Sequence, residues 1–352
     1  AGRVFSLDAF RGFTMIWMIS SGFGLAVFLN DPVLGPIARQ FTHAEWHGFY
    51  PWDLIQPFFM FIVGAAMPYS FARRWAAGEP WSRSLRHVLA RSGLLIFWGL
   101  VARSVQAGRP VVDLINVLAQ IAFTYLVAFL LLRKSWQVQF AAAVGLLALH
   151  TALYRFVSAP GIQGPWVPNA NFGWYVDGLI LGKHWGGYYA TINCLSSASA
   201  TIWGVMAGDL LRSGREQGHK IRLLAAWGLV AIVTGLALDP VIPIIKKIWT
   251  ASFAFYSAGY TLLALALFYW ICDVQRWRRW AEILVIVGAN SIFIYLFHEI
   301  LGRWMMQTAK GLLGWSVAWW GPWGEVFTAC TVIAFQVYVC WWLNQRKIFF
   351  KL

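Results

Sequence analysis

Residues 52–74 read WDLIQPFFMFIVGAAMPYSFARR, with one carboxylate near the start, two arginines at the end and no charge between them. A helix needs roughly 20 mostly apolar residues to cross a bilayer, so this segment predicts a membrane span. Comparable stretches lie on both sides of it, near residues 7–29, 87–104, 113–132, 136–157, 192–211, 222–244, 251–272, 281–300 and 324–343. The sequence therefore predicts an all-α, polytopic transmembrane bundle of about ten helices.

The composition excludes a soluble protein. Hydrophobic residues make up 59% of the chain and charged residues 12%, whereas soluble domains carry about 25% charged residues. Tryptophan, which is favoured at membrane interfaces, occurs 23 times. No polar linker divides the chain, so we expect residues 1–352 to form a single transmembrane domain.

The formal net charge of +14 does not indicate nucleic-acid binding, because the basic residues gather where apolar stretches end. They follow every even-numbered predicted span: Arg73, Arg74, Arg83 and Arg86; Arg133 and Lys134; Arg212, Arg215, Lys220 and Arg222; Arg276, Arg278 and Arg279; and Arg346, Lys347 and Lys351. Cytoplasmic loops of membrane proteins are enriched in Lys and Arg. The pattern predicts that both termini are cytoplasmic.

The opposite connections, residues 30–51, 158–191 and 301–323, are expected outside the cytoplasm. The strongest constellation, His43-Ala44-Glu45-Trp46-His47-Gly48, lies in the first of them and leads to Asp53 at the start of the second span. Histidine can act as a general base or a nucleophile, which makes His43, His47 and Asp53 candidate catalytic residues. On a helical turn the two histidines would share a face suited to a metal. No third ligand has a convincing spacing, so we predict no metal; an interfacial hydrogen-bonding role is the alternative for each imidazole.

Ionisable and polar groups inside spans are costly and tend to face a cavity or one another. Asp8 and Arg11 lie at the entry of the first span, where a helix-start ion pair is the simpler interpretation. Asn290, His298 and Glu299 lie in the ninth span. His298 and Glu299 either line the cavity that His43 faces or form an interfacial pair.

Lys246, Lys247 and Trp249 precede the eighth span on its outer side, against the positive-inside bias. An anionic ligand, or a buried carboxylate such as Asp239, would hold the lysines there. Ordinary snorkelling of the lysines is the alternative. Lys247 and Trp249 are therefore candidate binding residues.

Several motifs, in order along the chain, resemble those of the heparan-α-glucosaminide N-acetyltransferase family within the transmembrane acyltransferase superfamily. The resemblance is carried by Ser6-Leu7-Asp8-Ala9-Phe10-Arg11-Gly12, the His43–Gly48 constellation, Asp53-Leu54-Ile55, Phe61-Ile62-Val63-Gly64 and Gly288-Ala289-Asn290-Ser291-Ile292 with Tyr295. Asn116-Val117-Leu118 and Lys246-Lys247-Ile248-Trp249-Thr250 are weaker matches.

The resemblance implies transfer of an acetyl group from cytosolic acetyl-CoA to an extracytoplasmic amino sugar or glycan, across a bacterial cytoplasmic (inner) membrane. The family's catalytic histidine matches His43, as base or nucleophile. Asn290 and Ser291 are candidate oxyanion donors. Two departures stand out: Ser20-Ser21-Gly22 lies where the animal enzymes carry an assisting Asn, and His47 lies where Asn is common.

Two alternatives stay open. In a proton-coupled transporter or flippase, His43, His47 and Glu299 would relay protons. In an O-acyltransferase of cell-envelope polysaccharide, the chemistry would stay and the acceptor would change. The expected partners are an acyl-CoA, a glycan and the lipid bilayer, and no nucleic acid; a homodimer is compatible with the sequence.

Overall fold

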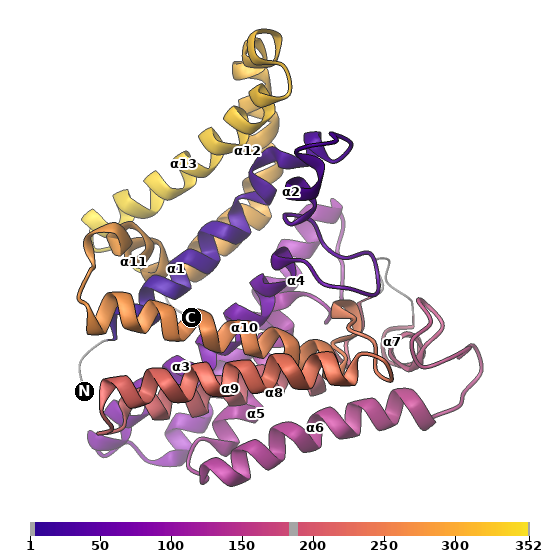
Figure 1. Cartoon of the computed structure of the whole chain (residues 1–352), viewed down its shortest axis with the longest axis vertical. Helices are drawn as coiled ribbons and strands as arrows, with labels where there is room; N and C mark the ends of the chain where they lie inside the picture. The colour runs from indigo at the N-terminus through magenta and orange to yellow at the C-terminus, as the bar shows by residue number, and fades with distance from the viewer. Residues whose placement is uncertain (1–3, 183–188, 351–352) are drawn as a thin grey trace. The chain divides into compact units, whose positions relative to one another are not determined.

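The computed structural model describes residues 4–182 and 189–350, and these residues form helices and no strands. Contacts divide the described chain into two compact units. The large unit contains residues 45–48, 56–182 and 189–270, and the small unit contains residues 4–44, 49–55 and 271–350. Figure 1 labels the helices of both units, and each unit is described by itself below.

The large unit holds most of the long helices. In chain order these are α3 (Ile55–Ala76), α4 (Trp81–Ala107), α5 (Val117–Leu131), α6 (Trp136–Phe156), α7 (Phe172–Leu181), α8 (Asn193–Arg212), α9 (Gln217–Leu238), the short turn Lys246–Ile248, and α10 (Ala251–Tyr269). Helix α8 packs against α5 and α6, and α10 packs along α9.

Helices α3 and α8 meet backbone to backbone because glycines line their crossing. A Cβ atom at Gly204 or Gly208 of α8 would collide with the backbone of Phe61 or Ala65, and one at Gly64 of α3 would collide with the carbonyl of Thr201. Gly204 and Gly208 form a GxxxG pattern, whose small residues let membrane helices approach closely. The register of these contacts shows that α3 and α8 run parallel.

The large unit therefore has two chemically different ends. Arg212, at the end of α8, donates a 3.3 Å hydrogen bond to the carbonyl of Pro68 in α3, so the arginines that end both helices lie at one end. We call this the basic end. The other end, where α3 and α8 begin, holds residues 45–48 and the connection between α9 and α10; we call it the loop end.

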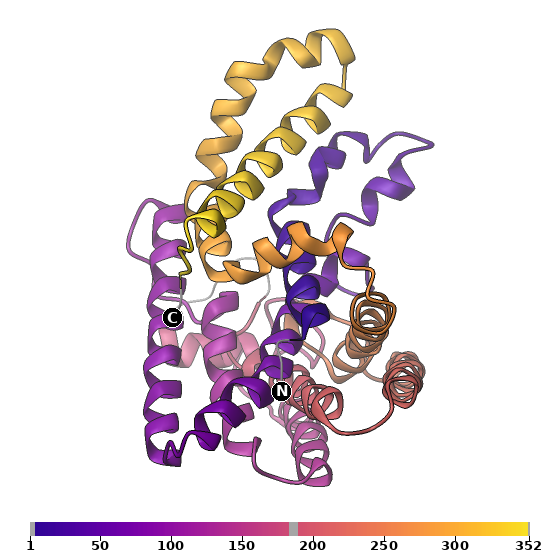
Figure 2. The same ribbon diagram turned by 90° about the vertical axis from the view of Figure 1, so that its left-hand side faces the viewer.

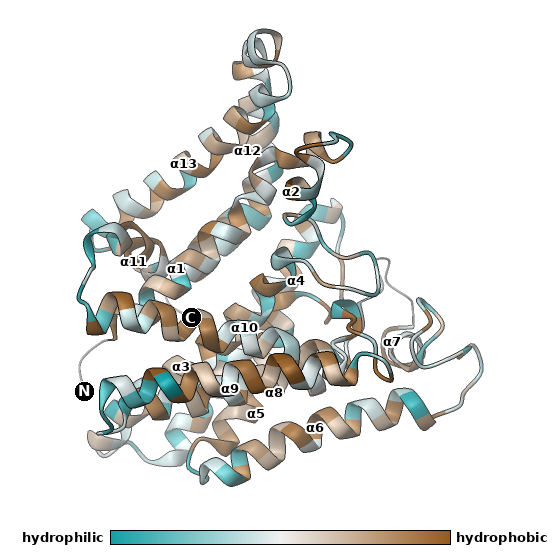
Figure 3. Ribbon diagram, in the orientation of Figure 1, coloured by the Kyte–Doolittle hydropathy of each residue, from teal (hydrophilic) through white to brown (hydrophobic). Residues whose placement is uncertain are grey.

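Helix α9 has the surface of a lipid-facing span. Only 17% of its most apolar 18-residue stretch is buried inside the protein. The exposed side chains of the helix include Leu229, Val230, Val233 and Leu236. The helix runs antiparallel to α10 (Figure 1). Figure 3 shows hydrophilic residues gathered at the start of α9 and at both ends of α6, with apolar surface between. Exposed apolar surface on this scale requires a lipid environment.

The small unit contains bent helices and a long hairpin. Its helices are α1 (Phe5–Ile19), the 3₁₀ segment Ser21–Phe28, α2 (Gly35–Arg39), the 3₁₀ turn Pro51–Leu54, α11 (Glu282–Ala289), α12 (Ser291–Trp320) and α13 (Trp323–Gln345). Helices α12 and α13 pack as an antiparallel hairpin (Figure 2). Gly12 of α1 and Gly288 of α11 allow a close crossing, because a Cβ atom on either would collide with the facing backbone.

The predicted all-α polytopic bundle is confirmed. Among the described residues, seven helices are long and apolar enough to span a membrane, or up to nine if two bent pairs each count as one span. The bent pairs are Phe5–Ile19 with Ser21–Phe28, at 43°, and Arg279–Ala289 with Ser291–Trp320, at 69°. The remaining predicted span, 113–132, forms the shorter apolar helix α5, whose Asn116 cap accepts a hydrogen bond from the backbone N–H of Ala119.

Three details of the prediction were wrong. The predicted span 7–29 breaks after Ile19, where Ser21 to Gly24 all adopt positive φ. The predicted span 281–300 breaks at Asn290. The predicted loop 301–323 is helical as far as Trp320, because no residue before Gly321 and Pro322 interrupts the helix; Gly321 then adopts a φ of 58°.

Candidate functional site

His43 and Asp53 form a closed pair within the small unit. Nδ1 of His43 lies 2.8 Å from Oδ1 of Asp53, whose side chain is fully buried, whereas the His43 side chain is 43% exposed. An ionised carboxylate accepts a hydrogen bond from an Nδ1–H group, so the lone pair of a neutral His43 lies on Nε2. The pair is built to present a basic nitrogen.

Local structure fixes the carboxylate. At the start of the 3₁₀ turn the backbone N–H of Asp53 donates to the carbonyl of Tyr50 at 2.8 Å, and Pro51 occupies the first position of the turn. The second oxygen of Asp53 accepts hydrogen bonds from the backbone N–H groups of Tyr50, at 3.0 Å, and Ala44, at 3.4 Å. Backbone donors of this kind stabilise a buried carboxylate in its ionised form. Asp53 therefore orients both the loop and the imidazole.

Aromatic packing holds the same loop. Trp52 is buried, its backbone N–H donates to the carbonyl of Gln40 at 3.2 Å, and its ring packs against those of Phe41 and Trp17. The residues on either side of His43 are thereby held to α1 and to one another.

His47 has a separate carboxylate partner, in the large unit. Its Nε2 lies 2.9 Å from Oδ1 of Asp239, with side chains 59% and 30% exposed. The same Asp239 oxygen accepts the backbone N–H of Ile244 at 2.7 Å, and Gly48 donates to the carbonyl of Ile244 at 3.0 Å. His47 therefore fastens its loop to the α9–α10 connection.

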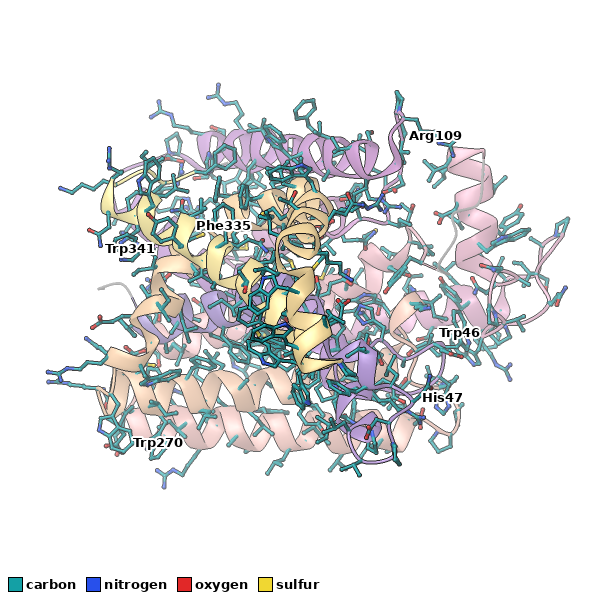
Figure 4. The ribbon with its side chains drawn as sticks, turned by 90° about the horizontal axis from the view of Figure 1, so that it is seen from above. Trp46, His47, Arg109, Trp270, Phe335 and Trp341 are labelled. Carbon is teal, nitrogen blue, oxygen red and sulfur yellow. The ribbon has the colours of Figure 1, made fainter. Side chains whose placement is uncertain are left out.

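Trp46 completes this attachment at the loop end of the large unit. Its indole Nε1 donates to the carbonyl of Trp166 at 2.9 Å, and its ring packs on a cluster that includes Tyr154 and Phe172. In Figure 4, Trp46 and His47 lie at one end of the α9–α10 pair and Trp270 lies at the other.

The metal interpretation of this loop rested on a helical turn, and that turn is absent. Residues 43–48 are extended and bent rather than helical, so His43 and His47 share no helical face. Each imidazole instead pairs with its own carboxylate. Within the described ranges, no group of three or more His, Cys, Asp or Glu side chains is arranged to hold a metal ion.

His298 lies in a polar contact of the small unit that also contains Ser21. Its Nδ1 lies 3.2 Å from Oε1 of Gln336 on α13, and its Nε2 lies 3.5 Å from the hydroxyl of Ser21. A Cβ atom at the neighbouring Gly22 would come within 3.1 Å of the carbonyl of Phe41, which places this turn beside the His43 loop.

The remaining predicted site residues of the small unit lie on α1, on α12 and at the bend between α11 and α12. Asp8 and Arg11 form a 3.3 Å ion pair on the first turns of α1, as the helix-start interpretation expects. Glu299 follows His298 on α12. The Asn290 side chain donates to the carbonyl of Ile348 at 3.1 Å and accepts the backbone N–H of Phe350 at 3.1 Å. Ser291 is the first residue of α12.

The lysine motif forms a tight, buried turn in the large unit. Trp249 is buried with a φ of 48°, and its carbonyl accepts a hydrogen bond from Ser196. The carbonyl of Lys247 accepts a 2.8 Å hydrogen bond from the side chain of Asn193. This motif joins the start of α8 to the start of α10.

Sequence reasoning did not select four residues, Gln336, Ser21, Asp239 and Asp113, as site residues. Gln336 is a polar side chain inside the predicted tenth span, and polar side chains at such positions are often functional. Ser21 gives no pattern of its own, and the pairing of Asp239 with His47 spans 192 positions. Buried Asp113, 2.8 Å from Nε of Arg103, was also missed.

The comparisons with known proteins agree with these features. Residues 3–237 match the model of the family described as heparan-alpha-glucosaminide N-acetyltransferase, catalytic. The heparan-alpha-glucosaminide N-acetyltransferases of Mus musculus and Homo sapiens are each 24% identical to the chain, over 86% and 85% of its length. The chain belongs to this membrane-protein family.

The match has limits that bear on function. The chain spans about half the length of these curated relatives, 54% of the mouse protein and 53% of the human one. The family match includes His43, His47 and Asp53, and it ends before Asp239 and the lysine turn.

Proposed function

We propose that the chain is a multi-pass membrane acetyltransferase that moves the acetyl group of acetyl-CoA to the amine of an amino sugar or glycan. The observation that carries the proposal is the His43–Asp53 pair, which lies inside the family match and presents an imidazole nitrogen opposite a buried carboxylate. An imidazole so oriented can serve as a general base or as a nucleophile.

In the direct route, the acceptor nitrogen attacks the thioester carbonyl carbon. The C–N bond forms, the C–S bond breaks, Nε2 of His43 takes the amine proton, and the departing CoA thiolate receives that proton. In the covalent route, Nε2 first attacks the thioester carbon and the C–S bond breaks, which gives an acetylimidazole and the CoA thiolate. The acceptor amine then takes the acetyl group as the Nε2–C bond breaks, and the amine proton passes to the CoA thiolate. Asp53 stabilises the imidazolium in the direct route and fixes the orientation of Nε2 in both.

The proposed topology places the donor in the bacterial cytoplasm and the acceptor outside, across the inner membrane. The two chemically different ends of the large unit support it, since arginines gather at the basic end and His47 lies at the loop end. Roles for Lys247, Trp249, His298, Glu299, Asn290, Ser291, Asp8 and Arg11 in binding substrates are part of the same proposal.

The test is acetyl transfer by purified protein in lipid nanodiscs, with radiolabelled acetyl-CoA and glucosamine. We expect labelled N-acetylglucosamine from the wild type and none from His43→Ala. Labelling of N-acetylglucosamine supplied as acceptor would instead indicate O-acetylation. Uptake of sugar into proteoliposomes without covalent change would overturn the proposal in favour of transport.

A further inference from the structure

The first half of α8, toward the loop end, carries a run of buried polar side chains. Asn193, Ser197 and Thr201 lie at positions i, i+4 and i+8, so they share one face of the helix. All three are at most 3% exposed. Each has a side-chain oxygen with no hydrogen-bond partner: Oδ1 of Asn193, Oγ of Ser197 and Oγ1 of Thr201.

A second element adds two more such atoms at the same end. Gln120 of α5 donates from its amide nitrogen to the carbonyl of Thr191, just before α8, at 3.1 Å. Its Oε1 is buried without a partner, as is Oγ1 of Thr191. The unpartnered atoms therefore come from α5, from the α8 approach and from α8 itself. We call Gln120, Thr191, Asn193, Ser197 and Thr201 the polar track.

Unpartnered polar atoms are expensive in a protein interior, and more so in a membrane protein. Most buried polar groups have a partner, so several unpartnered atoms in one place indicate a ligand that supplies the missing hydrogen bonds. A structural explanation fits the neighbouring residues but not these. Ser196 bonds the Trp249 carbonyl, and Ser199 bonds the Ser196 carbonyl at 2.7 Å.

The chemistry of the polar track defines its ligand. Two of its unpartnered atoms are amide oxygens, which only accept hydrogen bonds, and three belong to hydroxyls, which donate or accept. No member carries a charge. The matching ligand is neutral over this region and rich in hydroxyl groups, which is the chemistry of a sugar ring.

The α3–α8 contact closes the polar track on the side of the basic end. From Asn193 to Thr201 the helix rises about 12 Å. From the Thr201 backbone onward, α8 meets α3 so closely that a Cβ atom at Gly64, Gly204 or Gly208 would collide with the facing backbone, so the α3–α8 seam is closed toward the basic end. The α3–α8 seam therefore offers a ligand no path to these atoms from the basic end.

We infer that the polar track binds the hydroxyl groups of the sugar acceptor. This inference rests on the proposed function for the acceptor's identity, but its binding can be measured without acetyl transfer. These residues are specificity-determining, since they would distinguish a sugar amine from a simple amine. They take no part in the chemistry assigned to His43.

The test uses two conservative variants. Ser197→Ala removes a hydroxyl group, and Thr201→Val replaces a hydroxyl group by a methyl group. Ser199→Ala, on the same helix, is the matched control because its hydroxyl is already bonded. Kinetics are measured in nanodiscs with glucosamine and with cyclohexylamine, an amine without hydroxyls. Thermal stabilisation by glucosamine is measured separately without acetyl-CoA.

We expect Ser197→Ala and Thr201→Val to raise the KM for glucosamine roughly 3- to 10-fold each, the effect of one lost hydrogen bond. The KM for acetyl-CoA, turnover of cyclohexylamine, and the Ser199→Ala values for glucosamine should stay near wild type. The same two variants should weaken stabilisation by glucosamine. That binding result would support the inference even if the wild type transferred no acetyl group.

Three outcomes would overturn it. Unchanged KM and unchanged stabilisation by glucosamine in both variants would show that the hydroxyls meet no sugar. A rise confined to the KM for acetyl-CoA would assign the polar track to the donor instead. Equal losses with glucosamine and cyclohexylamine would indicate a general structural effect.

Discussion

Asp53 accepts a 2.8 Å hydrogen bond from Nδ1 of His43, while its second oxygen accepts hydrogen bonds from the backbone N–H groups of Tyr50 and Ala44. One buried carboxylate thus anchors the start of a helix, the loop before it and the imidazole between them. The consequence is a histidine whose orientation is set by the fold and not by its substrate.

The first prediction concerns His43. His43→Ala should lower acetyl transfer about 10²- to 10⁴-fold, the usual contribution of a general base, and a nucleophilic role would make the loss larger. The half-exposed side chain contributes little to packing, so the thermal unfolding temperature should stay near that of the wild type. His47→Ala should lose less activity, because its pairing with Asp239 holds a loop. An inactive His47→Ala beside an active His43→Ala would contradict this assignment.

The second prediction concerns pH and Asp53. Protonated His43 can neither accept a proton nor attack, so activity should fall on the acid side of the rate profile. A neighbouring carboxylate stabilises imidazolium. Asp53→Asn removes that charge, so its acid limb should move to lower pH while the maximal rate falls. Rate profiles between pH 5 and 9 provide the measurement; an acid limb that moves upward, or stays fixed, would argue that Asp53 does not act through His43.

The third prediction concerns topology. With both termini cytoplasmic, the α8–α9 turn is inside and the α9–α10 connection is outside. In a protein whose four native cysteines are replaced, Val241→Cys should react with a membrane-impermeant maleimide added to intact cells, whereas Arg215→Cys should react only after permeabilisation. Val241 is 75% exposed, so a lack of reaction cannot be attributed to burial. The reversed pattern would invert the orientation.

The fourth prediction concerns the α3–α8 crossing. Gly204→Ala should destabilise the protein by about 1–3 kcal/mol, since the added methyl group meets backbone atoms that cannot turn away. Gly145→Ala on α6 is the matched control, because nothing lies within 4 Å of its added Cβ atom. Thermal unfolding in detergent compares the two, and equal unfolding temperatures would show that the helices separate easily here.

The sequence predicts the membrane class and the span positions because apolar length and charge placement follow directly from the physics of the bilayer. It also selects His43 and Asp53, whose separation of ten positions lies within one motif. It does not predict the breaks at Ser21 and Asn290, where positive φ values and tertiary bonds decide the path. The hydrogen bonds of His47 with Asp239 and of His298 with Gln336 join distant segments of the chain, so no local sequence pattern predicts them.

The Asn290 contacts have a practical consequence for anyone shortening this protein. Its amide lies fully buried at the α11–α12 bend and is satisfied by Ile348 and Phe350. A version cut before Ile348 would leave a polar group without partners where water is scarce, which is costly. We expect such trimmed versions to be recovered in low yield and to elute broadly on size exclusion, while Asn290→Leu in the trimmed protein should partly restore both. Trimming that leaves yield and elution unchanged would show that the contacts of Asn290 with Ile348 and Phe350 are dispensable for purification.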